Sequence, residues 1–69
     1  MDVYVFKTSV PRAKFEQVAP ILNQGKSISK WNFDFNDCDN ILRVESKADI
    51  RSYICQFLHK HGFDCEELL

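Results

Sequence analysis

The sequence predicts a small α+β domain in which two helices cover one face of a four-stranded antiparallel sheet. Three observations lead to this prediction. Short segments alternate apolar and polar residues, as half-buried strands do. Two other segments repeat apolar residues at the i, i+3, i+4, i+7 spacing of a helix with one buried face. At 69 residues, the chain has room for one domain, which we place at residues 1–69.

The first expected strand is residues 2–9, where Val, Tyr and Phe are frequent. Tyr4 and Phe6 share one face of this strand, whereas Val3 and Val5 share the other. Because both faces are partly apolar, we expect this strand in the middle of the sheet.

The first helix is expected to begin at Pro11, whose missing N–H costs nothing in the first turn, with Thr8 or Ser9 as a nearby cap. Pro20 predicts a kink or an early end, because it lacks a donor and crowds the preceding turn. Residues 23–25 (Asn-Gln-Gly) predict the end of the helix. The expected buried face consists of Phe15, Val18, Ala19 and Leu22.

The clearest half-buried strand begins at Trp31, which alternates with polar residues together with Phe33 and Phe35. We expect this strand, residues 30–36, at an edge of the sheet, where two copies of the chain can pair as a homodimer. Trp31 lies either in the core or at the rim of an exposed patch. The core is favoured, because Trp31 is in phase with the two phenylalanines.

An Asx-rich turn, residues 37–40, leads into an expected partner strand at residues 41–45. Ser46 is a plausible N-cap of the second helix, with Asp49 three residues later in a position like that of a capping box. Gly62 is suited to the left-handed conformation that ends a helix. The apolar stripe of this helix is expected to be Ile50, Ile54, Phe57, Leu58 and His61.

Residues 63–68 complete the pattern as a short edge strand whose acidic residues discourage further pairing. The resulting order, βαββαβ, fits a ferredoxin-like sandwich. The expected core consists of Phe6, Phe15, Val18, Leu22, Phe33, Phe35, Leu42, Val44, Ile50, Ile54, Phe57 and Phe63.

Composition limits the classes of binding partner and the cellular compartment that we expect for this chain. A net charge of −1 gives no general attraction for nucleic acid or an anionic membrane, and no apolar run approaches the roughly 20 residues that span a bilayer. Three irregularly spaced cysteines do not form the even framework of a small secreted domain. We therefore expect no nucleic-acid or membrane partner, and a cytoplasmic protein with reduced thiols.

Two stretches carry a family resemblance. Residues 5–10 (VFKTSV) look like a first strand leading into a metal loop, and residues 61–67 (HGFDCEE) look like the end of a second helix. Over nearly its whole length the chain resembles the heavy-metal-associated (HMA) domain of copper chaperones and metal-transporting ATPases. That family binds metal through a Gly-Met-x-Cys-x-x-Cys loop. The corresponding residues 9–15 contain no cysteine, so the resemblance implies the fold without the metal loop or a metal cofactor.

Side chains able to bind a soft metal are scattered along the chain. His59 and His61 point about 200° apart on a helix, so they do not face one another. We expect His59 to be solvated, His61 to be partly packed, and the thiols to act as small hydrophobes. Whether any of them binds metal stays open in the sequence. The set comprises Cys38, Cys55, Cys65, His59 and His61.

Other chemistries have weaker support. The acidic residues Asp34, Asp37 and Asp39 lack the spacing of a calcium loop and indicate a solvated turn. An acylphosphatase-like enzyme needs a glycine-rich phosphate loop, whereas only Arg12 is present here. The open sheet face is expected to be mixed and polar, unlike the aromatic platform of an RNA-binding sheet. Its residues are Asn32, Asp34, Asn36, Arg43 and Glu45.

The sequence thus predicts no catalytic, cofactor-binding or metal-binding residues. It indicates a non-catalytic module for interaction with, or regulation of, an unknown protein partner. A metal-binding protein or metallochaperone with non-standard Cys/His ligands is the alternative, and an acylphosphatase-like enzyme is the second alternative.

Overall fold

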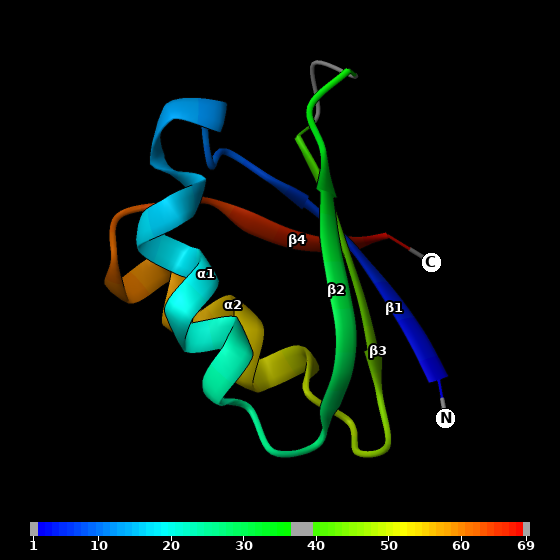
Figure 1. Cartoon of the computed structure of the whole chain (residues 1–69). Coiled ribbons are helices and arrows are strands. Elements are labelled where there is room, and N and C mark those ends of the chain that lie inside the picture. The colour runs from blue at the N-terminus through cyan, green and yellow to red at the C-terminus, as the bar shows by residue number, and fades with distance from the viewer. Residues whose placement is uncertain (1, 37–39, 69) are drawn as a thin grey trace.

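The computed structural model describes residues 2–36 and 40–68 as four strands, a short 3₁₀ turn and two α-helices (Figure 1). Every strand pair is antiparallel, and both helices cover the same face of the sheet. The α+β architecture predicted from sequence is therefore confirmed. The elements are β1 (Asp2–Thr8), η1 (Arg12–Lys14), α1 (Phe15–Gln24), β2 (Ile28–Asp34), β3 (Ile41–Ser46), α2 (Arg51–Lys60) and β4 (Cys65–Leu68).

The strand order across the sheet is β2-β3-β1-β4. β1 pairs with β3 on one side and β4 on the other, so that Phe6 lies opposite both Leu42 and Glu67. Phe6 is fully buried beneath the helices, whereas Val3, on the opposite face, is 58% exposed. β1 thus lies in the middle of the described sheet, and β2 and β4 lie at its two edges.

The core is more aliphatic than the sequence suggested. Phe15, Phe33, Phe57 and Phe63 were expected to be buried, but they are half-buried and pack against the rim of the core. Phe35 is also only half-buried. These rings come from β2 and the segment after it, from α1, and from the C-terminal half of α2 and the segment after it. They lie at the boundary between the core and the surface. The buried cluster is Phe6, Val10, Val18, Leu22, Leu42, Val44, Ile50, Ile54 and Leu58.

The start of α1 differs from the prediction. Neither Thr8 nor Ser9 caps a helix, because both hydroxyls bind other segments of the chain. Thr8 Oγ1 donates to the carbonyl of Asn40 at 2.8 Å, and Ser9 Oγ accepts from the backbone N–H of Asp64 at 2.7 Å. These bonds tie the end of β1 to the starts of β3 and β4.

The early end predicted at Pro20 is wrong, since α1 continues to Gln24 and ends at Gly25 as expected. Pro20 and Glu16 are both exposed, so water can reach the Glu16 carbonyl that lacks its helical donor.

The N-cap predicted at Ser46 is also wrong, because α2 begins five residues later, at Arg51. Ser46 is fully buried, and its hydroxyl donates to the Ser27 carbonyl at 3.1 Å. Asp49 instead accepts from the backbone N–H of Arg51 at 3.1 Å and from its guanidinium at 2.6 Å and 2.9 Å. Gly62, at φ +86°, ends the helical segment in the left-handed region, as predicted.

Replacing Leu42 with Ala tests the position of the core. Leu42 is fully buried between β1 and β2, so the cavity is expected to lower the free energy of unfolding by about 2–5 kcal/mol. Urea denaturation measures the change. The matched control is Val3→Ala on the exposed face of β1, which is expected to cost less than about 0.5 kcal/mol. Equal losses in the two variants would place the core elsewhere.

Replacing Asp49 with Asn tests the ion pair at the start of α2. Hydrogen bonds from Arg51 lower the pKa of Asp49 to about 2. Because the folded pKa is depressed, the stabilisation is fully present above the ordinary pKa of about 4 and is lost progressively as pH falls through the folded pKa of about 2. The difference in melting temperature between the native protein and Asp49→Asn should be constant near neutral pH and shrink below pH 4. A constant difference down to pH 2 would contradict this assignment.

Candidate functional site

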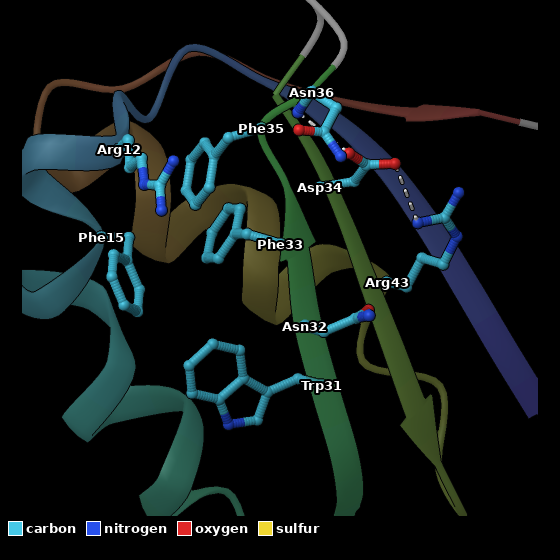
Figure 2. A pocket seen from close by; sticks show the side chains of 9 residues that line it. All are labelled: Arg12, Phe15, Trp31, Asn32, Phe33, Asp34, Phe35, Asn36 and Arg43. Atoms are coloured by element: carbon cyan, nitrogen blue, oxygen red, sulfur yellow. Dashed lines mark hydrogen bonds and ion pairs between the residues drawn. The ribbon is translucent and has the colours of Figure 1, made fainter.

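An open groove of about 580 Å³ follows β2 at the edge of the sheet (Figure 2). Side chains from both faces of β2 line it, together with residues of η1, α1 and β3, so the groove wraps around the outer edge of the strand. We call it the β2 groove. It is lined by Arg12, Phe15, Trp31, Asn32, Phe33, Asp34, Phe35, Asn36 and Arg43.

Four aromatic rings form the helix-side wall of the β2 groove. Phe33 stacks on Phe35 at 5.2 Å between centroids and meets the edge of Trp31 at 6.1 Å. Phe15 of α1 packs against Phe33 and Phe35 at 6.4 Å and 5.9 Å. All four rings are half-buried, so each keeps part of its surface available for contact.

Trp31 is held in place by a hydrogen bond, since its indole N–H donates to Asn23 Oδ1 of α1 at 2.8 Å. Trp31 packs against the core but is only half-buried. It therefore combines the two positions that the sequence left open, because the indole packs against the core and also lines the β2 groove.

The opposite wall of the groove is polar. Arg43 forms a salt bridge with Asp34 at 3.8 Å, with side chains 47% and 36% exposed, and Asp34 also accepts from the backbone N–H of Asn36 at 3.0 Å. The mixed polar character predicted for this sheet face is confirmed. Among the described residues that line the groove, none has a thiol, imidazole or hydroxyl side chain. These residues offer ring surfaces, hydrogen-bonding groups and charge for contact with a partner.

The segment after β1 is anchored by a buried side chain and by a hydrogen bond. Val10 is fully buried in the core, and the backbone N–H of Val10 donates to Thr8 Oγ1 at 3.3 Å. Arg12 and Lys14 follow as exposed residues of the η1 turn. Arg12 faces the β2 groove (Figure 2) rather than a loop of backbone N–H groups that could cradle a phosphate.

A pair of thiols lies between α2 and β4, which is the edge strand opposite β2. Cys55 of α2 and Cys65 of β4 are half-buried, with their Sγ atoms 3.2 Å apart. Burial, followed by the contact with Cys55, raises the pKa of the Cys65 thiol well above its usual value. No pattern in the sequence predicted that these two cysteines lie together. The only signal was their position on two neighbouring elements, which does not fix the direction of either side chain.

The remaining soft ligands stay apart. His59 is exposed, as predicted, and lines a shallow hollow with Cys65. His61 is exposed rather than partly packed, because α2 ends at Lys60, although its ring meets the edge of Phe57 at 4.6 Å. Cys38, Asp37 and Asp39 lie outside the described residues. Within residues 2–36 and 40–68, no three His, Cys, Asp or Glu side chains gather to hold a metal ion.

Comparisons of the chain with family models, with curated proteins and with solved structures gave no match. Among the described residues, neither helix is long and apolar enough to cross a membrane.

The thiol pair gives a redox prediction, best tested in a Cys38→Ser background so that two thiols remain. Glutathione disulfide is expected to oxidise Cys55 and Cys65 to an internal disulfide, releasing two molecules of glutathione. Intact-mass spectrometry should show the loss of two hydrogen atoms without a stable adduct. Adding Cys55→Ser should leave a glutathione adduct or a free thiol at Cys65. Stable adducts on both cysteines would contradict their close approach.

Proposed function

We propose that this chain is a non-catalytic cytoplasmic interaction module that adds an extended polypeptide segment to the free edge of β2. In this proposal the domain is ferredoxin-like and resembles an HMA domain that has lost its metal loop. The observation that carries the proposal is the β2 groove, which places an aromatic wall beside the unpaired side of an edge strand.

Strand addition suits this surface for a backbone reason. β2 is the last strand on its side of the described sheet, so its outward N–H and C=O groups have no neighbouring strand. An added strand would bond to these groups, while its side chains alternate between the aromatic wall and the polar wall. Within the aromatic wall, Phe15 of α1 packs against Phe33 of β2. This contact holds the rings in place, so the surface is largely preformed.

The fold and the loop after β1 also support the proposal. The order β2-β3-β1-β4, with both helices on one face, agrees with a ferredoxin-like topology. The loop after β1 is the position of the metal loop in the HMA family. Here Val10 is buried in the core and Ser9 is hydrogen-bonded to Asp64, so this loop serves packing.

One observation favours the alternative of a metal carrier. A soft ion such as Cu(I) prefers thiolates, and the Sγ atoms of Cys55 and Cys65 are already adjacent. His59 lies beside Cys65 in the same hollow. The raised pKa of Cys65 opposes metal binding near neutral pH, because metal binding requires the thiolate.

Metal titration of the purified, reduced protein separates the two functions. Native mass spectrometry with Cu(I) and with Zn(II) is expected to show no stable complex of one metal ion per chain. The matched controls are Cys55→Ser and Cys65→Ser, whose spectra should equal that of the native chain. A complex of one ion per chain that is lost in either variant would overturn the interaction module and establish the metal carrier.

A further inference from the structure

We propose that the strand added to β2 is β2 of a second copy, antiparallel and centred on a two-fold axis at Asn32. The two four-stranded sheets would then form one continuous sheet. This inference rests on the proposed function in taking the edge of β2 as the binding surface, and it goes further by naming the partner and the register.

The register follows from the regular part of β2. A bulge between Ile28 and Lys30 interrupts pairing at one end, and the strand ends at Asp34 at the other. The regular stretch, residues 30–34, therefore has Asn32 at its centre. Antiparallel pairing about Asn32 places Lys30 opposite the partner's Asp34, and symmetry repeats this pair of opposite charges.

The same register matches the aromatic face. Trp31 and Phe33 point to the helix side of the sheet, so pairing about Asn32 places Trp31 opposite the partner's Phe33, again twice. Both rings are half-buried in the single chain, and cross-strand aromatic pairs would cover part of their remaining surface. Charge and ring complementarity thus arise in a single register.

The charges already present on the open face extend this pattern. Within one chain, Lys30 lies opposite Glu45 of β3, and Asp34 forms its salt bridge with Arg43. Across the proposed junction, Lys30 would lie between Glu45 of its own chain and the partner's Asp34, and the partner's Arg43 is the diagonal neighbour of the partner's Asp34. Each of these three neighbouring pairs joins opposite charges and is therefore attractive.

The other edge of the sheet is unsuited to the same pairing. β4 has four residues, and two of them, Glu66 and Glu67, carry negative charge. Pairing β4 with its own copy would bring these carboxylates close together, which disfavours it. Pairing β2 with the partner's β4 would leave a free edge at each end and produce growing chains. Self-pairing of β2 closes after two copies and, unlike self-pairing of β4, brings opposite charges together.

A charge exchange tests the register. Lys30→Glu alone places carboxylates opposite the partner's Asp34, and Asp34→Lys alone places two ammonium groups together. Each variant is therefore expected to dimerise about 10- to 100-fold more weakly than the native chain. In an equimolar mixture, one copy of each variant restores two attractive pairs, so heterodimers should form.

Sedimentation velocity over a concentration series, under reducing conditions, measures the dimerisation. Native mass spectrometry identifies heterodimers by mass, and the emission of Trp31, the single tryptophan, reports on the junction itself. Because each substitution also disturbs a neighbour within its own chain, thermal melts check that both variants remain folded. That disturbance is identical in the homodimer and the heterodimer.

The matched control is a mixture of Lys60→Glu and Asp64→Lys, which carries the same net charges at exposed sites away from β2. The proposal predicts native-like dimers of each control variant and no preference for the heterodimer. It is overturned if the native chain stays monomeric, if it grows beyond a dimer, or if the test mixture behaves like its separate variants. A monomer that binds no metal would overturn this dimer and leave the proposed function standing, whereas a metal complex would overturn that function.

Discussion

β1 is the strand through which the whole sheet is held together. It pairs with β3 and with β4, which are distant in sequence, and it buries Phe6 beneath both helices. The bonds of Thr8 and Ser9 then fix the segment that follows β1. With β1 in the centre, β2 and β4 become the two edges, and their residues decide which edge accepts a partner. The proposed activity thus depends on the arrangement of backbone pairing, not on a chemical group in a loop.

The sequence predicted the strands and helices well, because their patterns reflect burial on one face. It failed at the helix starts, where the hydroxyls of Thr8 and Ser46 serve tertiary hydrogen bonds instead of local caps. A cap and a tertiary bond need the same residue types, so composition cannot distinguish them. The half-buried state of Phe15 and Phe33 was missed for a related reason, since periodicity gives the face of a residue but not its distance from the rim of the core.

The candidate site was predicted only in part. Alternation placed Trp31 and Phe33 on one face of an edge strand, which is the basis of the β2 groove. The bond from Trp31 to Asn23 and the approach of Cys55 to Cys65 each join a helix to a strand, and the apolar periodicity of the separate elements does not signal them. Lys30 and Asp34 lie at equal distances from Asn32, but this symmetry identifies a pairing register only when the bulge and the end of β2 are known from the structure.

Hydrogen–deuterium exchange at low and high protein concentration shows directly whether the edge of β2 accepts a strand from a second copy. The predicted result is slower exchange in residues 30–34 at high concentration, with the exchange of β4 unchanged, because only outward amides of β2 would gain hydrogen bonds. Exchange of residues 30–34 that does not depend on concentration would contradict self-pairing at this edge. Slowing confined to β4 would place the binding edge on the opposite side of the sheet.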